Sequence, residues 1–421
     1  MAKKENKFTK LELAWILYDV GNSAFTMLAC SLVTVWFKQL ALSDGVSQAN
    51  ATAYWSYVAS IVTILVAIIG PVCGTIADNK GFKKPIFTTS LAIGVATCIA
   101  TGLVTSWKAF LIVFIAAKVA YQACNVFYDA MLTDVTTDEH MDVVSSQGFA
   151  WGYIGSCLPF AVALVFYMAG EGMLGGFTVS QRLAKIIGFG VTGIWWLAVT
   201  IPLLKNYEQK YYVLPQKGAI KDCFKRIKDS IVKIVKTDKK VLYFLLAFFL
   251  YIDGVNTIID DAVNIGTFLG LNDVGLIIML LCTQVVAFAF SLIFSQLSKK
   301  YETVKLIQVC IVGYFLVSIY AIFLQNLWQF AIMAFGVGMF QGAIQALSRS
   351  YYGKIIPPDN AGEYFGIYDI FSKGASFLGT LLIGIVTQMT NSINIAVGCL
   401  AFFFIAGLFL IRVADKTPIK K

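Results

Sequence analysis

The sequence predicts an all-α integral membrane protein with twelve transmembrane helices. Its 421 residues are 58% hydrophobic and only 14% charged, whereas a soluble domain is about half apolar and about a quarter charged. The apolar residues also gather in continuous runs, and a helix needs roughly 20 such residues to cross a bilayer. The composition excludes a soluble enzyme, a nucleic-acid-binding domain and a disordered chain. A membrane barrel would instead alternate polar and apolar residues.

Twelve apolar windows follow one another along the chain, and each predicts one helix across the membrane. The first window is too long for the apolar region of a signal peptide, so we expect it to remain as the first helix. The windows cover residues 13–37, 51–77, 85–106, 109–133, 145–169, 184–204, 241–264, 274–297, 306–325, 327–350, 362–389 and 391–411.

A hydrophilic segment at residues 205–240 separates the first six windows from the last six. We therefore expect an N-terminal six-helix half at residues 1–204, a linker, and a C-terminal six-helix half at residues 241–421. The linker carries eleven Lys or Arg residues against four Asp or Glu residues. Its apolar residues from Ile220 to Val235 recur at helical spacing, which indicates a basic amphipathic helix on an anionic lipid surface. A target for a calmodulin-like partner is the alternative.

The distribution of basic residues predicts the orientation in the membrane. If the N-terminus is inside, the inner segments hold 27 Lys or Arg residues and the outer segments hold four. Such an excess is typical of cytoplasmic loops, so both termini should face the cytoplasm. The net charge of +9 then reports topology, and no nucleic-acid partner is expected.

Six charged residues fall inside the predicted spans, where each costs at least about 2.5–3.5 kcal/mol if it faces lipid. They must therefore face the interior of the bundle, pair with one another, or line a water-filled cavity. These residues are Asp19, Lys118, Asp129, Asp253, Asp369 and Lys373.

Polar side chains accompany these charges along single helix faces. In the fourth window, steps of four, three and four residues align them on one face. Because lipid exposure of such stripes is costly, we expect them to converge on one wet cavity. The cavity candidates are Asp19, Asn22, Lys118, Gln122, Asn125, Asp129, Asp253, Asn256, Gln341 and Gln345, and Arg349 lies one turn beyond the last.

The loop after the second window carries a gate-like pattern, G-x-x-x-D-x-x-G followed by basic residues. Gly74 permits close approach of two helices and Gly81 permits a tight turn, while Phe82 separates Gly81 from the first basic residue, Lys83, which comes one position later than in the pattern. Asp78 can accept hydrogen bonds from a helix N-terminus or a basic side chain at an inner gate. With the six-plus-six arrangement, this loop resembles that of the major facilitator superfamily, whose halves are parallel repeats. An ordinary basic cytoplasmic loop is the alternative.

Several further stretches resemble one branch of that superfamily, the vacuolar amino-acid effluxer family of autophagy with its bacterial relatives. They lie in both halves, in order, and cover nearly the whole chain. They are residues 18–25 (YDVGNSAF), 126–130 (VFYDA), 152–155 (GYIG), 251–258 (YIDGVNTI), 345–350 (QALSRS) and 365–369 (FGIYD) with Lys373. The chain departs from the family pattern at Asp129, where an Asn is expected, at Lys118, and at Gly379-Thr380 in place of Gly-Pro.

The resemblance implies a secondary transporter that exports amino acids or related small metabolites by alternating access. Its membrane would be the cell membrane, or the vacuolar membrane in a eukaryote. Lys118 lies about nine residues from the outer end of its window, so ~14 Å deep. A Lys there suits a substrate carboxylate and an Asp suits an ammonium group, whereas mutual pairing that holds the bundle together is the alternative.

Coupling and gating have candidate residues of their own. A buried Asp can carry a coupling proton. Arg349, Asp369 and Lys373 are assigned to gating or coupling, although Asp369 and Lys373 are four residues apart on one helix. They can therefore form a simple structural pair.

Other classes of protein leave fewer traces in the sequence. The chain has one histidine, His140, and nine cysteines without a metal-binding spacing, so we expect no metal and no cofactor. Without a G-x-x-x-x-G-K-[ST] loop, ATP is not expected as the direct energy source. Acidic residues at 134–142 suggest a membrane enzyme with Mg²⁺ as one alternative, but a solvated loop is the favoured interpretation. A facilitative channel or a substrate sensor is another alternative, and we expect a monomer that is not an enzyme.

Overall fold

The chain folds into long helices in a computed structural model. The model describes residues 7–214, 223–260, 262, 265–266, 270 and 273–418, without the side chains of 273–275, 277–278 and 373–377. The helices of the N-terminal part are α1 (Lys10–Ala29), α2 (Leu32–Ser43), α3 (Gln48–Ala77), α4 (Lys83–Leu103), α5 (Trp107–Val135), α6 (Met141–Gly170) and α7 (Gln181–Asn206). Those that follow are α8 (Cys223–Lys236), α9 (Lys239–Asp260), α11 (Asp273–Leu297), α12 (Thr303–Ala321), α13 (Leu327–Ile355), η1 (Pro358–Asn360), α14 (Ala361–Thr390), α15 (Ile393–Cys399) and α16 (Ala401–Lys416).

Polar capping residues set the starts of several helices. The Thr9 side chain accepts from the Glu12 N–H, and the Glu12 side chain accepts from the Thr9 N–H, which satisfies two otherwise unpaired donors of the first turn. The side chains of Ser47, Ser180 and Asn326 cap α3, α7 and α13, where each accepts one backbone N–H of the first turn. Helices α1, α3 and α7 therefore begin a few residues before the windows that hydropathy alone predicts, whereas α13 begins at Leu327, as predicted.

Two predicted windows are not single helices. Window 13–37 divides into α1 and α2 at Ser31, whose hydroxyl donates to the Met27 carbonyl at 2.6 Å and competes with the helical backbone bond. Window 391–411 divides into α15 and α16 at Leu400. Taken as continuous, both pairs count among the eleven stretches of the described chain that are long and apolar enough to cross a membrane.

The predicted count of twelve spans stays a prediction. Window 362–389 corresponds to α14. Among the described residues of α14, only the stretch Leu378–Thr390 is apolar, and it is shorter than the eleven other stretches. The all-helical membrane architecture is confirmed by the eleven longer stretches.

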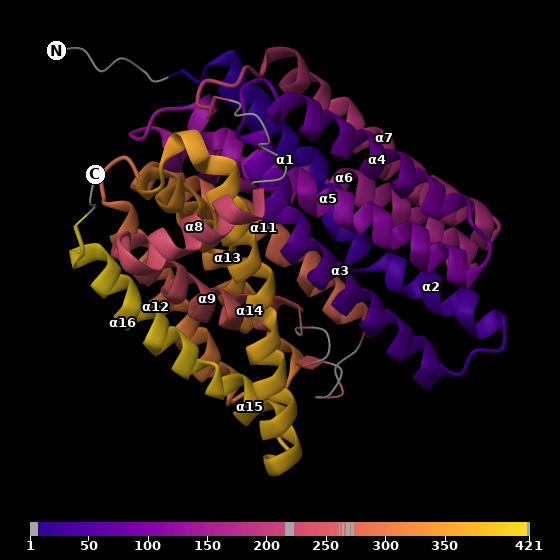
Figure 1. Ribbon diagram of the computed structural model, residues 1–421. Helices are drawn as coiled ribbons and strands as arrows, with labels where there is room; N and C mark the ends of the chain where they lie inside the picture. Colours follow the sequence, from indigo (N-terminus) through magenta and orange to yellow (C-terminus); the bar gives the residue numbers. More distant parts are fainter. Residues whose placement is uncertain are drawn as a thin grey trace.

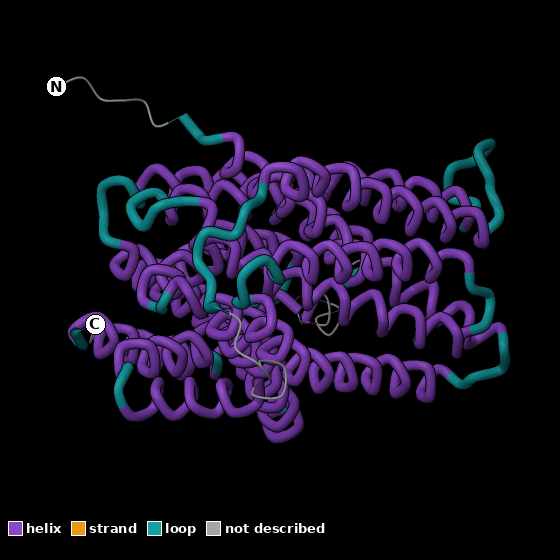
Figure 2. The backbone as a smooth tube through the Cα atoms, turned by 45° about the horizontal axis from the view of Figure 1, so that its top comes forward, coloured by secondary structure: helices purple, strands orange, loops and turns teal. Residues whose placement is uncertain are grey.

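The helices enclose two separate hydrophobic cores. One lies between Ala14 and Tyr207, and the other lies almost wholly between Ile234 and Ala414. Figure 1 shows the two bundles meeting at the end where both chain termini lie and diverging toward the opposite end. In Figure 2 the top of the molecule is turned toward the viewer. The helices of each bundle lie side by side, and the loops gather at the helix ends.

Glycines bring the two bundles into contact through α3 and α14. A Cβ on Gly74 would lie 2.1 Å from the Gly362 carbonyl oxygen, and one on Gly366 would lie 2.6 Å from the Pro71 Cα. The backbones therefore touch, as small residues allow between membrane helices. A second contact between the bundles joins α6 to α11 and α13.

Candidate functional site

Arg349 of α13 reaches across to two carboxylates of the other bundle. One guanidinium nitrogen lies 3.1 Å from Asp129 on α5, and another lies 3.4 Å from Asp19 on α1. Its Nε also donates to the Ser145 hydroxyl of α6 at 3.0 Å. The side chain of Arg349 is only 5% exposed, so the cation is stable there only because it is paired and hydrogen-bonded.

Aromatic rings surround this charged centre. The Arg349 guanidinium lies 4.6 Å from the Trp15 ring centre and 4.5 Å from that of Phe149, close enough for cation–π attraction. The Tyr128 hydroxyl donates to Asp19 at 3.1 Å, and the Trp15 indole donates to the Tyr128 carbonyl at 2.9 Å. The rings hold the ions in place and exclude water from them.

The other polar residues of the N-terminal bundle do not join this centre. The Asn22 amide donates to Asn125 at 2.9 Å, and Gln122 is buried. Lys118 lies over the rings of Phe25 and Tyr121, 5.9 and 5.3 Å from their centres. It is eleven residues from Asp129 along α5, so ~16 Å away.

Asp253 occupies a different setting, where α9 packs on α14. Its Oδ1 accepts from the Gly379 N–H at 2.9 Å and from the Thr257 hydroxyl at 3.4 Å. Its Oδ2 is buried without a hydrogen-bond partner in the part of the chain that the structure describes. One turn onward, the Asn256 amide donates to the Ser372 carbonyl at 3.4 Å.

The remaining candidates are less informative about the site. Gln341 is buried and Gln345 is half-buried on α13, and Asp369 is half-buried on α14. The side chain of Lys373 lies outside the described residues. The expected pairing of Asp369 with Lys373 therefore stays a prediction.

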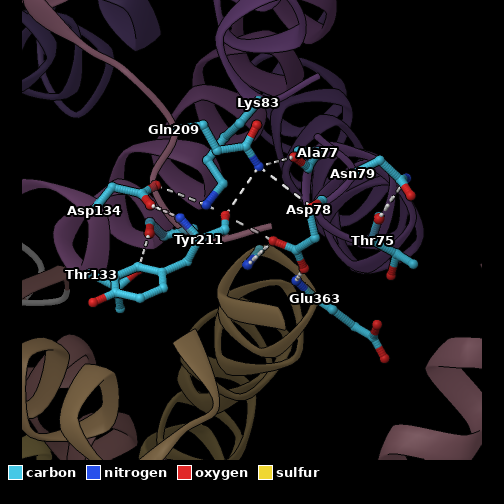
Figure 3. A network of polar contacts seen from close by, with 12 residues as sticks. Thr75, Ala77, Asp78, Asn79, Lys83, Thr133, Asp134, Gln209, Tyr211 and Glu363 are labelled. Atoms are coloured by element: carbon cyan, nitrogen blue, oxygen red, sulfur yellow. Dashed lines mark hydrogen bonds and ion pairs between the residues drawn. The ribbon is translucent and has the colours of Figure 1, made fainter. Parts of the chain in front are cut away.

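The loop pattern around Asp78 forms one connection between the bundles at the end where the chain termini lie, which is here called the inner end. This connection is called the α3–α14 latch. Asp78 accepts from the N–H groups of Gly362 and Glu363 at 2.7 and 2.8 Å, which places a carboxylate at the N-terminus of α14 (Figure 3). Burial raises the pKa of Asp78 to about 7, although Lys83 and the two N–H groups lower it. Gly81 adopts φ +80°, as the turn requires.

Lys83 extends this latch into the first bundle. Its ammonium lies 3.0 Å from Asp134 at the end of α5 and 4.0 Å from Asp78. Asp134 also accepts from the backbone N–H groups of Lys210 and Tyr211 at 3.0 and 2.9 Å; Figure 3 shows Asp134 beside Tyr211. These hydrogen bonds hold the start of the linker against the end of α5, and Lys83 connects it to the loop between α3 and α4.

Tyr207 completes this attachment of the linker. Its hydroxyl donates to Asp134 at 2.6 Å. Burial, together with the charge of Asp134, raises the pKa of Tyr207, so the phenol keeps the proton that it donates.

Asp142 forms a second connection, here called the α6–α13 latch. It sits in the first turn of α6 and accepts from the hydroxyls of Thr303 and Ser350, both at 2.6 Å. Its Oδ2 lies 2.7 Å from the ammonium of Lys354. All three partners belong to the second bundle, so each latch joins an acid of one bundle to donors of the other.

The prediction that the acidic segment 134–142 is a solvated loop is wrong for its two ends. Asp134 and Asp142 are 0% and 4% exposed; Asp134 pairs with the buried Lys83, and Asp142 pairs with Lys354, whose side chain is 22% exposed. Of the acidic residues in this segment, only Asp138 and Glu139 are solvent-exposed. Among the described residues, no three His, Cys, Asp or Glu side chains are grouped to hold a metal ion.

The fold has known counterparts among membrane transporters. The fucose:proton symporter FucP of E. coli, in the outward conformation, superimposes with a TM-score of 0.73 over 97% of this chain and 99% of that chain, at 13% identity. The human organic anion transporter MFSD10 gives a TM-score of 0.70 over 95% and 98% of the two chains, at 14% identity. The chain therefore has the same fold as these two transporters.

Sequence comparison places the chain within that class. The model of the family described as "Vacuole effluxer Atg22 like" matches residues 9–142 and 133–418. An uncharacterized MFS-type transporter, YxiO of Bacillus subtilis, is 38% identical over 96% of this chain and 95% of its own length. Autophagy-related protein 22-2 of Aspergillus clavatus is 26% identical over 66% of this chain, which spans only 48% of that longer protein. The chain belongs to the Atg22-like effluxer family of membrane transporters.

Proposed function

We propose that the protein is a secondary active transporter that exports a small zwitterionic metabolite, such as an amino acid, by alternating access. The observation that supports this most is the Arg349 centre, where one bundle contributes the cation and the other contributes Asp19 and Asp129. A charge centre split between two rigid bundles can form in one state and separate in the other, which is how such an element gates a path. The family description as an effluxer supports the direction of transport.

Lys118 and Asp253, which lie outside the Arg349 centre, support the proposed substrate class. We infer that Lys118 binds the substrate carboxylate. Asp253 receives the ammonium group, because its Oδ2 is buried without a hydrogen bond from the described residues. Hydrogen bonds to the polar parts of the substrate come from Gln122, Asn125, Gln341 and Gln345.

Counterflow in proteoliposomes tests the transport cycle. Vesicles loaded with an unlabelled amino acid should concentrate the labelled compound transiently, since a carrier exchanges solutes across the membrane. A channel or a sensor would give no transient accumulation. A thermal-shift screen of metabolites on the purified protein selects the compound first, because ligand binding raises apparent stability.

The variant Lys118→Gln tests whether Lys118 binds the carboxylate of a zwitterionic substrate. Lys118→Gln should weaken binding of amino acids and simple carboxylates while sparing amines of similar size. Equal losses for carboxylates and amines would instead assign Lys118 to structural support. Lys108, an exposed outer lysine, provides the matched control as Lys108→Gln.

Proton coupling is assigned to the buried acids, with Asp19 and Asp129 as the first candidates because Asp253 is proposed to bind the substrate ammonium group. Asp19→Asn, Asp129→Asn and Asp253→Asn are compared for uptake driven by a pH gradient. Loss of pH-driven uptake with counterflow retained identifies the coupling residue. Unchanged pH-driven uptake in all three variants rejects coupling through these acids.

The membrane placement belongs to the same proposal. With both termini in the cytoplasm, the latches lie at the cytoplasmic end of the two halves, 1–204 and 241–421, and the linker 205–240 lies on that side. The protein acts as a monomer in the cell membrane. Modification of engineered cysteines at residues 7 and 418 by a membrane-impermeant reagent, in intact and in opened cells, checks the orientation.

A further inference from the structure

Helix α8 in the linker has two apolar sides, of which only one is packed. Cys223 and Ile234 are 1% and 3% exposed, whereas Phe224, Ile231 and Val235 are 68%, 45% and 46% exposed. The exposed three are spaced by seven and four residues, so they form one stripe along the helix. This stripe adjoins the packed side and lies open along its whole length.

The rest of the α8 surface is strongly basic. Between residues 223 and 236 the only acid is Asp229, against five basic residues, Lys225, Arg226, Lys228, Lys233 and Lys236. An exposed apolar stripe beside a basic surface is the pattern of a helix that lies in the headgroup region of an anionic bilayer. Exposure of the large apolar ring of Phe224 would be unfavourable on a surface that contacts only water.

The contacts of α8 place its first turn at the level of a membrane-spanning helix. The Cys223 thiol donates to the Val72 carbonyl of α3 at 3.5 Å. Val72 precedes the end of α3 at Ala77 by five residues, a rise of ~7.5 Å. The exposed stripe therefore begins beside an apolar span and close to its inner end, where headgroups and acyl chains meet.

The same helix touches both sides of the α3–α14 latch. Its Arg226 lies 3.5 Å from Glu363 of α14, and the backbone N–H of Glu363 donates to Asp78 at 2.8 Å. Figure 1 shows α8 beside the first part of α14. Once α3 and α14 separate, α8 cannot keep both the Val72 contact and the Glu363 contact.

We propose that α8 is a binding site for anionic phospholipids of the surrounding bilayer, and that lipid bound there stabilises the closed inner end through Arg226 and Glu363. The apolar stripe inserts among acyl chains, and the lysines bind the phosphate groups. The coupling to gating rests on the proposed alternating-access cycle, whereas the binding of lipid does not.

Hydrogen–deuterium exchange of the full chain in lipid nanodiscs tests both steps. Phosphatidylcholine discs are compared with discs that contain phosphatidylglycerol in addition. We expect phosphatidylglycerol to slow exchange in peptides from α8 and, separately, in the peptide that carries the N–H groups of Gly362 and Glu363. The triple variant Lys225→Gln, Lys228→Gln, Lys236→Gln should lose most of both effects, since each basic residue near an anionic surface contributes roughly fivefold in binding.

Arg226→Gln separates binding from coupling. In this variant α8 should keep its protection by phosphatidylglycerol, whereas the peptide with Gly362 and Glu363 should no longer respond. The matched control is the triple variant Lys299→Gln, Lys300→Gln, Lys305→Gln, which removes the same charge from another exposed segment, the loop after α11 and the first turn of α12, and should keep both responses.

Three outcomes would overturn the proposal. Equal exchange of α8 in the two kinds of disc removes the lipid site. A response of α8 without a response at Gly362 and Glu363 in the unmodified chain removes the coupling. Protection of α8 by an acidic peptide but not by phosphatidylglycerol assigns the surface to a protein partner. None of these readouts depends on transport, so failure of the proposed substrate is seen separately, in counterflow.

Discussion

The α3–α14 latch and the α6–α13 latch connect the same two bundles with different chemistry. In the first, Asp78 binds two backbone N–H groups at the start of a helix, and glycines bring the backbones into contact behind it. In the second, Asp142 binds hydroxyls and an ammonium at the ends of side chains. Backbone donors are fixed by the helix, whereas side chains can turn to other partners. We therefore expect the α3–α14 latch to be rigid and sensitive to substitution, and the α6–α13 latch to be adjustable.

The largest effect is expected where the backbones touch. Gly74→Ala places a Cβ 2.1 Å from the Gly362 carbonyl oxygen, and no side chain is available there to move aside. We expect the state with the inner end closed to lose about 3 kcal/mol of stability relative to the open state, which is the upper end of the usual cost of overpacking. Spin-label distances between the inner ends of α3 and α14 report the open fraction. Gly384→Ala on α14, where a Cβ would meet nothing within 4 Å, should leave that fraction unchanged.

Asp78→Asn should have the next largest effect. The amide can accept from only one of the two N–H groups and turns its own NH₂ toward the other, so one buried donor loses its partner. The cost is about 2 kcal/mol for a hydrogen bond to a charged group. The same distance measurement checks it. An open fraction equal to that of the unmodified chain would show that the carboxylate is not needed to close the inner end.

The pH dependence of the first latch comes third. The pKa of Asp78 is about 7 in the closed structure and should fall toward about 4 when opening exposes it to water. The closed state then binds the proton more tightly, so acidification from pH 8 to pH 6 should favour it by roughly tenfold. Asp78→Asn should remove this dependence, whereas Asp142→Asn should retain it. An opposite sign in the distance measurement would contradict the assignment.

A smaller effect is expected for Asp142→Asn in the second latch. The hydroxyls of Thr303 and Ser350 can rotate to the remaining oxygen, so the chief loss is the ion pair with Lys354. We expect about 1 kcal/mol. The distance between labels at the inner ends of α6 and α13 measures it, and a loss as large as that for Asp78→Asn would abolish the distinction between the latches.

Lys354→Gln should have the smallest effect. The side chain of Lys354 is 22% exposed, and water can take its place beside Asp142. The expected loss is below about 1 kcal/mol, as for partly exposed ion pairs. Raising the salt concentration should reduce the difference between this variant and the unmodified chain, and an effect independent of salt would argue against an ionic contribution.

Sequence reasoning located most of the residues but not their partners. Asp19, Asp129 and Arg349 are recognisable because charges inside apolar windows are costly. Their joining into one centre was not predictable, because Arg349 lies 330 residues from Asp19 and no sequence spacing relates the two. Asp134 and Asp142 appeared to belong to a solvated loop, since acids between helices usually do. The available signal in the sequence was an acid in the first turn of α6, Asp142, together with a basic residue at the end of α13, Lys354.

The sequence by itself determined the class of fold, most of the long apolar helices within a few residues and the identity of the costly charges. Apolar run length and charge cost are local properties, so they can be read along the chain. Only the tertiary structure decided that Asp78 binds the start of α14, that Lys83 pairs with Asp134, and that Arg349 pairs with two acids while Lys118 lies over aromatic rings. Those choices depend on which helix faces meet, and contacts between backbones separated by hundreds of residues fix them.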